Sequence, residues 1–204
     1  MQGNQPSAAI KCRLVLVRHA AAEGDGRFQG QLDVPLTGVG RQQLRELVKQ
    51  LSRFPVRAIY SSDLLRARAT AAAVARKFGI EVESRPGLRE IHFGRWQGLS
   101  WKQVTSRFPR EARLWTERFP SQPIPGAEAF EDFKRRVERE LEEILAVNRG
   151  RCALVITHAG VTRVILARAL GMEDRNLFRI AQEPGGVNVI DYFDDGVLVR
   201  CVNG

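Results

Sequence analysis

Cysteine is scarce in this sequence. Its 204 residues include only three, Cys12, Cys152 and Cys201, and no two of them form a CxxC pair. An odd number of cysteines, each in or beside an apolar stretch typical of a strand, argues against a disulfide framework and against a zinc site. We therefore expect reduced, packed thiols, no metal ion and no catalytic thiol.

Long apolar runs are also missing. No run approaches the roughly 20 residues that a membrane-spanning helix needs, and residues 1–9 are small and polar, without the basic and apolar regions of a secretory signal. We expect a cytoplasmic protein with no membrane partner, in which residues 1–10 form a disordered tail.

Acidic residues are outnumbered by basic ones. The sequence has 32 Lys and Arg against 23 Asp and Glu, a formal net charge of +9, and this excess indicates an anionic partner. The arginines are spread along the whole chain rather than gathered in one block with interleaved aromatics, so nucleic acid is not the expected partner. The length and a hydrophobic content of 44% favour one domain over residues 1–204.

Strand-like and helix-like patterns alternate along the chain. Short apolar runs predict strands, and apolar residues at helical spacing predict helices. The expected strands are 13–17, 58–60, 80–84 and 152–157, with a closing hairpin of 187–193 and 197–202. The expected helices cover 39–51, 67–78, 101–119, 130–145 and 161–170. This order predicts an α/β sheet covered on both faces.

Two local features accompany this pattern. Either Ser62 or Asp63 is expected to cap the helix that follows the second strand. Residues 98–126 are expected to form an insertion. Three tryptophans, Trp96, Trp101 and Trp115, are expected to pack this insertion rather than to form a stacking platform for substrate.

Two of the three histidines end the two clearest strands. His19 follows the first strand directly behind Arg18, and His158 follows the strand at 152–157. A single histidine after a strand usually makes a structural hydrogen bond, but ligands in α/β sheets bind beyond the carboxyl ends of the strands. Arg66, near the start of a helix, makes a shared pocket cationic, which suits phosphate because guanidinium groups match phosphoryl oxygens in pairs. Glu90 is the nearest candidate acid, although a surface carboxylate is the simpler interpretation of Glu90 alone.

An ordered series of motifs covers residues 13–191. In chain order they are 16–20 (LVRHA), 26–30 (GRFQG), 33–37 (DVPLT), 61–67 (SSDLLRA) with Thr70, 90–98 (EIHFGRWQG), 125–128 (PGAE) and 157–160 (THAG). This series resembles the histidine phosphatase superfamily, also called phosphoglycerate mutase-like. The resemblance implies a three-layer α/β/α fold with a mostly parallel central sheet and a small helical insertion over the site.

The resemblance also implies roles for the candidate residues. His19 looks like the nucleophile that forms a phosphohistidine, and Glu90 like the proton donor to the leaving oxygen and then the base that activates water. Arg18, Arg66 and His158 look like the groups that stabilise the phosphoryl oxygens. A route through a phosphorus–nitrogen bond needs neither a metal nor another cofactor.

The loop after His19 departs from the family pattern. The family usually has Gly, an acid and Thr directly after the nucleophile and Asn six residues after it, whereas Ala20, Ala21, Ala22 and Asp25 stand here. The loop from Ala20 to Gly26 is also about two residues shorter than the corresponding loop of the family. We expect Arg27 to replace the contact of the missing Asn, and the same segment adds Gln29 and Gly30 to the expected phosphate-binding residues.

The function that the resemblance implies is hydrolysis of a phosphomonoester on a small phosphorylated metabolite, such as a sugar phosphate, a phosphoglycerate or α-ribazole phosphate. The motifs are most similar to the α-ribazole phosphatase-type and broad-specificity branch. One alternative is a cofactor-dependent phosphoglycerate mutase, which we favour less because family mutases usually carry a C-terminal tail over the site. The other is a weakly active regulatory or binding member, which the altered loop permits. The expected assembly is a monomer or a homodimer.

Overall fold

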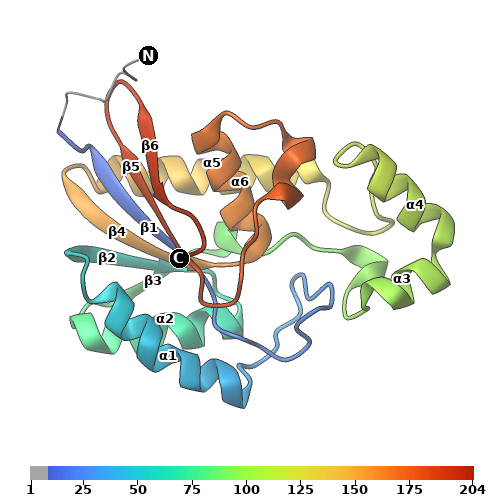
Figure 1. Ribbon diagram of the computed structural model, residues 1–204, viewed down its shortest axis with the longest axis horizontal. Coiled ribbons are helices and arrows are strands. Elements are labelled where there is room, and N and C mark those ends of the chain that lie inside the picture. The colour runs from blue at the N-terminus through green and yellow to red at the C-terminus, as the bar shows by residue number, and fades with distance from the viewer. Residues whose placement is uncertain (1–8) are drawn as a thin grey trace.

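A six-stranded sheet forms the centre of the protein (Figure 1). The computed structural model describes residues 9–204, so most of the expected tail lies outside the described residues. The strands stand in the order β3–β2–β4–β1–β5–β6. Their bounds are β1 (Cys12–Arg18), β2 (Val56–Ser61), β3 (Val82–Ser84), β4 (Arg151–Thr157), β5 (Val187–Tyr192) and β6 (Val197–Cys201). The first four pair in parallel, and β5 and β6 add an antiparallel edge, which confirms the prediction of a mostly parallel sheet.

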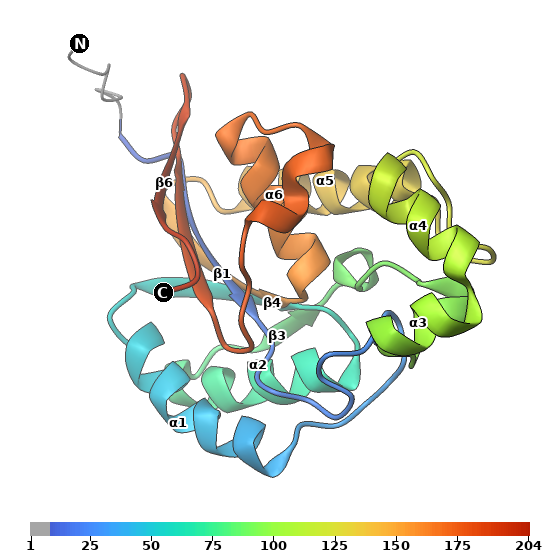
Figure 2. The same cartoon turned by 45° about the vertical axis from the view of Figure 1, so that its right-hand side comes forward.

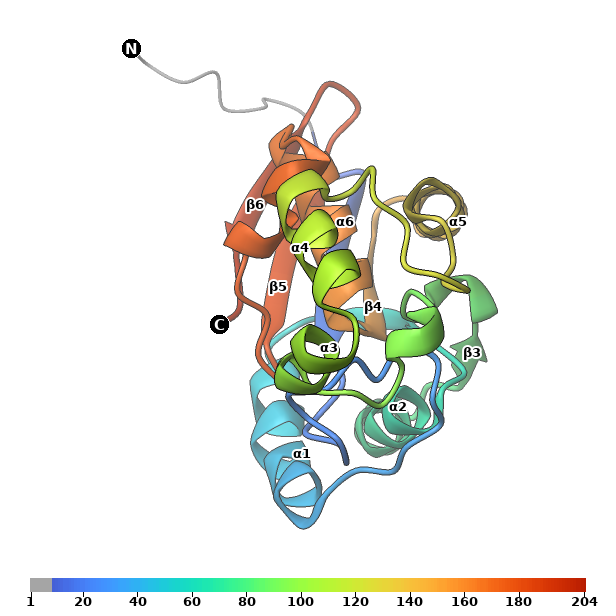
Figure 3. The same ribbon diagram turned by 90° about the vertical axis from the view of Figure 1, so that its right-hand side faces the viewer.

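Helices cover both faces of this sheet, as Figures 1 and 3 show. One layer consists of α1 (Gly38–Leu51) and α2 (Leu65–Phe78), and the other of α5 (Phe130–Val147) and α6 (Ala159–Leu170). Parallel strands need crossover connections, and α1, α2 and α5 supply them, while α6 leads to the antiparallel strand β5. The predicted three-layer α/β/α architecture is therefore confirmed. Within residues 9–204, no helix combines the length and the apolar character that a membrane crossing requires.

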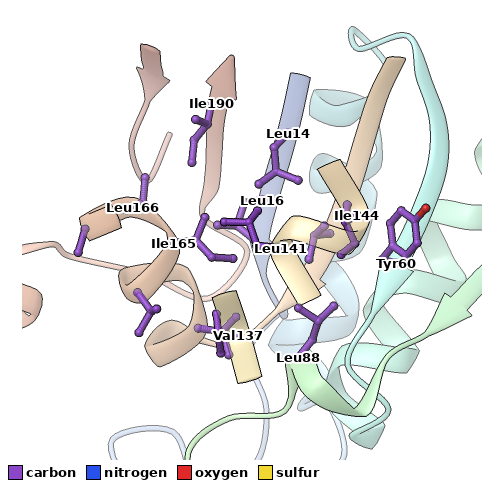
Figure 4. Packing of buried hydrophobic residues seen from close by; sticks show 14 of the residues in the cluster. Leu14, Leu16, Tyr60, Leu88, Val137, Leu141, Ile144, Ile165, Leu166 and Ile190 are labelled. Atoms are coloured by element: carbon purple, nitrogen blue, oxygen red, sulfur yellow. The ribbon is translucent and has the colours of Figure 1, made fainter. Parts of the chain in front are cut away.

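The core is divided by the sheet into two apolar layers. Alternate residues of a strand point to opposite faces, so Val15 and Val17 of β1 pack with α1 and α2. Leu14 and Leu16 belong to the other cluster, with Leu141 of α5 and its neighbours (Figure 4). Burial on both faces explains why the central strands are continuous apolar runs in the sequence.

The segment 98–126 contains two helices, α3 (Trp101–Arg107) and α4 (Pro109–Arg118), where the sequence pattern predicts one continuous helix. The break falls at Phe108, because proline disfavours helical geometry in the residue before it while fitting the first position of a new helix. Figures 1 and 2 show α3 and α4 standing apart from the three layers. Their assignment as an insertion within a single domain of residues 1–204 stays a prediction.

Three short 3-10 helices complete the described part of the chain, η1 (Pro86–Leu88), η2 (Gly94–Trp96) and η3 (Asp174–Arg179). The predicted cap of α2 is wrong: the N-cap residue is Leu64, and it provides no side-chain bond. The carboxylate of Asp63 is instead held by the guanidinium of Arg89, with 2.7 Å between Nε and Oδ1, in a bidentate pair that is stronger than a neutral capping bond. The first backbone N–H of α2, that of Leu65, donates to the carboxylate of Asp33 from a distant loop.

Candidate active site

The pairing of β1 with β4 brings His19 and His158 together. The two strands are parallel neighbours, and their register pairs Arg18 with Thr157, so the residue that follows each strand leaves the sheet at the same edge. The two imidazole rings lie with their centroids 5.2 Å apart. Both side chains are buried, at 2% and 1% exposure. The sheet thus creates one polar pocket from residues that are far apart in the sequence.

His19 is held with one ring nitrogen directed to the backbone and the other to a guanidinium. Its Nδ1 lies 2.8 Å from the carbonyl oxygen of Ala20, which can only accept, so Nδ1 carries the proton. Nε2 therefore holds the lone pair and accepts a bond of 3.1 Å from Nε of Arg66. Burial and the neighbouring charge of Arg66 lower the pKa of His19 to about 3, against the opposing effect of the Ala20 bond. At neutral pH the ring is uncharged, and Nε2 carries a lone pair that could attack an electrophile.

Arg66 is a buried cation in the first turn of α2, only 1% exposed. Its two amino groups donate to the carbonyl oxygens of Leu32 and Gly30, each at 2.7 Å. Burial lowers the pKa of Arg66 to about 10, and the charge of Glu90 opposes this shift. The side chain therefore remains charged at neutral pH, directly beside Nε2 of His19.

Arg18 and His158 each have a buried nitrogen without a hydrogen-bond partner among the described residues, namely Nε of Arg18 and Nδ1 of His158. The rest of each side chain is fixed. Arg18 donates to the carbonyl oxygen of Gln182 at 2.7 Å and pairs with Asp25 at 3.2 Å. Nε2 of His158 lies 2.8 Å from Oγ of Ser62. Buried polar nitrogens are rarely left unbonded, and each of these two is available to bond an anion.

Burial also determines the charge of His158. Its pKa is held well below the usual value by burial first, and then by the charge of Arg66 and the neighbouring His19. The ring is therefore neutral at neutral pH. A neutral imidazole bonded through Nε2 can still offer an N–H at Nδ1 when the hydroxyl of Ser62 is the donor to Nε2.

Glu90 is a mostly buried acid at the edge of this pocket, 8% exposed. Its two carboxylate oxygens accept from the backbone N–H groups of Ile91 and Gly160, each at 2.9 Å. A methyl group at Gly160 would overlap Oε1 of Glu90. Gly160 lies in the first turn of α6 and His158 is the N-cap of that helix, so the same helix N-terminus places the acid and one imidazole.

The segment 25–30 contributes unequally. The carbonyl oxygen of Gly30 binds Arg66, as described above, but the guanidinium of Arg27 donates to the carbonyl of Gly98 and to Gln103. The side chain of Gln29 donates to the carbonyl of Glu23 in its own loop, at 2.6 Å. Arg27 and Gln29 are thus tied to neighbouring backbone, and phosphate binding by them stays a prediction.

Three residues of the pocket are missing from the sequence-based set. Ser62 contacts His158, Gly160 holds Glu90, and the carbonyl of Gln182 fixes Arg18. Ser62 and Gly160 do lie in the motifs at 61–67 and 157–160, which could have singled them out. Gln182 acts through its backbone carbonyl, which every residue possesses, so no pattern in the sequence marks it.

This arrangement can bind and attack a phosphoryl group. A neutral nucleophilic nitrogen lies beside a fixed guanidinium, a second arginine and an imidazole N–H site, which are the donors that phosphoryl oxygens require. A carboxylate nearby can exchange a proton with an oxygen atom. Over the described part of the chain, no three His, Cys, Asp or Glu side chains gather in a way that would hold a metal ion.

Relatives of the chain include named phosphatases. The chain is 32% identical over 163 residues to phosphoserine phosphatase 1 of Hydrogenobacter thermophilus, covering 79% of this chain and 77% of that protein. Proteins of Mycobacterium bovis and Mycobacterium tuberculosis are 32% identical over 195 residues, which are 94% of this chain; the chain spans about half of their length, 53%.

Solved structures share the fold. The α-ribazole phosphatase from Shigella flexneri superimposes with a TM-score of 0.83 at 26% identity, covering 94% of this chain and 96% of that one. The family model described as histidine phosphatase superfamily (branch 1) matches residues 14–204. With the arrangement of His19, Arg66 and His158 at one end of a three-layer sheet, these matches give one conclusion: the chain belongs to branch 1 of the histidine phosphatase superfamily.

Proposed function

We propose that the protein is a phosphomonoester hydrolase, which transfers the phosphoryl group of a small phosphorylated metabolite to Nε2 of His19 and then to water. The observation that carries this proposal is the state of His19. Its Nδ1 proton is held by the Ala20 carbonyl and its ring is kept neutral by burial, so Nε2 offers a lone pair next to the guanidinium of Arg66.

The first step forms a bond between Nε2 and phosphorus and breaks the bond between phosphorus and the ester oxygen. Glu90, in its protonated form, gives its proton to the departing oxygen, so that the alcohol leaves neutral. The imidazole keeps its Nδ1 proton, and the Ala20 carbonyl stabilises the positive charge that the ring acquires. The product of this step is a phosphohistidine and a Glu90 carboxylate.

The second step reverses the role of Glu90. Its carboxylate takes a proton from a water molecule, the oxygen of that water bonds to phosphorus, and the nitrogen–phosphorus bond breaks. Arg18, Arg66 and the Nδ1 position of His158 stabilise the phosphoryl oxygens in both steps, because the negative charge on them is retained throughout. Their fixed positions mean that little reorganisation accompanies the charge transfer.

We propose further that this reaction uses no metal or other cofactor and takes place in the cytoplasm, with neither nucleic acid nor membrane as a partner, in a monomer or a homodimer. The relatives support a small metabolite as substrate, since they include proteins named for phosphoserine and for α-ribazole phosphate. Activity that survives EDTA would support the metal-free route, and a loss restored by added metal would contradict it.

Replacement of the nucleophile tests the reaction directly. We expect His19→Ala to lower p-nitrophenyl phosphate hydrolysis by about 10⁴-fold or more, because the covalent route is then closed. Circular dichroism and thermal melting check that the variant is folded. Rapid quenching of wild-type enzyme should recover a phosphoryl group that is labile to acid and stable to alkali, and mass spectrometry should place it on His19. Retained turnover by His19→Ala would refute the proposed nucleophile.

A single assay also addresses the phosphoglycerate mutase alternative. Phosphorylated metabolites are incubated with the enzyme, and free phosphate and isomerised product are measured in the same sample. Hydrolysis predicts phosphate without isomer. Isomer that depends on a bisphosphate primer would instead show transfer to a second substrate hydroxyl.

A further inference from the structure

A cavity of about 430 Å³ lies beside Glu90, between α4, α5 and α6. Glu90 and Gly160 form part of its wall, so it adjoins the acid that would protonate a leaving group. Much of the remaining wall is aromatic: Phe93, Trp115, Phe119, Phe130, Phe133 and Phe178. A volume of this size lies in the range of pockets that enclose drug-sized ligands, roughly 300–1,000 Å³, and it far exceeds what a serine or glycerate fragment fills.

The aromatic wall is a continuous packed structure. The rings of Phe119 and Phe178 meet edge to face with centroids 4.9 Å apart, and Trp115 meets Phe178 at 5.2 Å. Phe119 in turn contacts Phe130 at 5.2 Å. Edge-to-face packing fixes the orientation of each ring, so the cavity presents flat apolar surfaces. Trp115 therefore both packs the insertion and lines a candidate binding surface.

The charges in this wall do not favour a second anionic group on the substrate. Three carboxylates line the cavity, those of Glu90, Glu128 and Glu131, against one guanidinium, that of Arg163. Arg136 neutralises Glu128 through two bonds of 2.6 and 2.8 Å. Glu90 is protonated when it acts as the acid, and the carboxylate of Glu131 matches the single charge of Arg163. An acid such as the serine carboxylate therefore meets no net positive charge here.

Arg163 itself is part of the aromatic surface. Its Nε donates to the carbonyl oxygen of Ile180 at 2.9 Å, and its guanidinium stacks over the ring of Phe178 at 5.5 Å. A guanidinium beside an aromatic ring can also attract the electron-rich face of a second aromatic group.

We infer that this cavity binds the leaving alcohol of the substrate and that the alcohol carries an uncharged aromatic ring system. The inference rests on the proposed hydrolase function, since it assigns the leaving-group side of the same site. It separates this chain from a phosphatase of compact amino-acid or glycerate esters, for which an apolar cavity beside the acid has no use.

Three esters of unactivated primary alcohols test the inference: 2-phenylethyl phosphate, ethyl phosphate and phosphoserine. We expect kcat/KM for the phenylethyl ester to exceed that for each of the others by at least tenfold, which is about the gain from transferring one phenyl ring out of water. Equal rates, or faster hydrolysis of phosphoserine, would overturn the inference while leaving the hydrolase proposal in place.

Two aromatic residues provide a matched pair of variants. Phe178 and Trp101 are both exposed, at 56% and 41%, and both contact Trp115, but only Phe178 lines this cavity. Phe178→Ala should reduce the ratio of phenylethyl to ethyl ester turnover at least fivefold, and Trp101→Ala should preserve that ratio. Ala127→Leu, which fills the cavity instead of enlarging it, should also reduce the ratio and serves if Phe178→Ala is unstable. A ratio unchanged by both lining variants would overturn the inference.

Binding separates failure of the inference from failure of the proposed function. Calorimetry with the His19→Ala variant should give a Kd at least tenfold lower for 2-phenylethyl phosphate than for ethyl phosphate. If the wild-type enzyme hydrolyses neither these esters nor p-nitrophenyl phosphate, the hydrolase proposal fails, and this binding ratio alone supports or refutes the aromatic site. Equal dissociation constants would refute it.

Discussion

The two ends of the site are held together by different forces. At the phosphate end, Arg66 and Arg18 are fixed by short hydrogen bonds to backbone carbonyls of separate loops. In the cavity next to it, the wall consists of rings such as Trp115, Phe119 and Phe178 in mutual contact. Hydrogen bonds to backbone are directional and fix positions closely, whereas apolar contacts depend mainly on fitted volume.

This difference indicates that the residues for phosphoryl transfer and the residues that select the substrate lie in separate regions of the molecule. The phosphate end combines polar groups that must keep their geometry for phosphoryl transfer. The cavity can change its shape through exchanges of one apolar residue for another without disturbing those groups. We therefore expect changes at the phosphate end to affect the chemistry for every ester, and changes in the cavity to affect the choice among esters.

Glu90→Gln gives the largest expected effect in this comparison, because Glu90 borders both regions. The amide cannot donate the proton that an alkoxide leaving group needs, so kcat/KM for alkyl phosphates should fall by about 10²–10⁴-fold. p-Nitrophenyl phosphate has a good leaving group, so the rate at which it phosphorylates the enzyme should fall far less. Rates over a series of esters ranked by the pKa of the leaving alcohol measure this, and equal slowing of all esters would contradict the acid role.

Gly160→Ala should reproduce the same pattern more weakly. The added methyl group would overlap Oε1 of Glu90 and so displace the acid without removing it, and a displacement of about 1 Å can cost on the order of 10²-fold in rate. We expect a loss of about 10- to 100-fold for alkyl phosphates, with a smaller loss for p-nitrophenyl phosphate.

Gly38→Ala is the matched control for this change. Gly38 also lacks a positive φ, and a methyl group there meets no atom within 4 Å. Gly38→Ala should leave both esters unaffected. If Gly160→Ala slows alkyl and aryl esters equally, Gly160 has a general structural role and does not position Glu90.

The buried histidines of the phosphate end should make the free energy of unfolding of the protein depend on pH. The pKa of His19 is lowered to about 3 and that of His158 is also lowered, whereas unfolded histidine has a value near 6.5. The unfolded chain therefore binds more protons below about pH 6.5. The contribution of the two neutral histidines to the free energy of unfolding is present above that pH and is lost progressively as the pH falls toward 3.

Urea unfolding at pH 7, 6 and 5 measures this dependence. Each histidine contributes up to about 1.4 kcal/mol per pH unit to the decline in the free energy of unfolding below pH 6.5. His19→Ala should show a shallower decline than wild type over the same range, above the pH at which unfolded carboxylates titrate. Identical slopes would show that His19 is not held neutral.

Asp25→Asn gives the smallest expected effect. Asp25 is exposed and pairs with Arg18 at 3.2 Å, so its carboxylate competes with phosphate for the same guanidinium. An exposed pair contributes roughly 0.2–1 kcal/mol, which predicts a decrease in the inhibition constant of inorganic phosphate of up to about fivefold. The same decrease in the inhibition constant should be measured with an aromatic and with an aliphatic ester as substrate.

Asp194→Asn removes the same charge elsewhere and is the control. Asp194 is exposed and pairs with Lys11 and Arg149. Its replacement should leave the inhibition constant unchanged. If both variants tighten phosphate binding to the same degree, net charge explains the effect and the local competition of Asp25 does not.

Much of the fold could be predicted from the sequence because its strongest signals are local. The strands before His19 and His158 are apolar runs, buried on both faces in the structure. Thr37, in the motif at 33–37, caps α1 through its side chain, which is a contact within one turn of chain. Such signals depend on a few neighbouring residues, so these elements can be predicted without knowing which distant segments they contact.

Contacts between distant segments could not be predicted in the same way. Asp63 has the residue type and position of a helix cap, yet Arg89 binds it while Asp33 reaches the helix from another loop. The packing that brings a competing partner close is decided over the whole chain. Residues 101–118 divide into two helices at Pro109, a local signal that helical spacing of apolar residues alone does not reveal.

The family and the three-layer sheet could be predicted from residue types at short spacing, and the same local patterns make His19, Arg66 and His158 candidates for the chemistry. Only the folded chain shows that Nε2 of His19 is the nitrogen that carries the lone pair, that Gly160 holds Glu90 and that aromatic rings line a cavity beside the acid. Those features depend on burial and on the directions of backbone groups. Both arise only when the chain has packed.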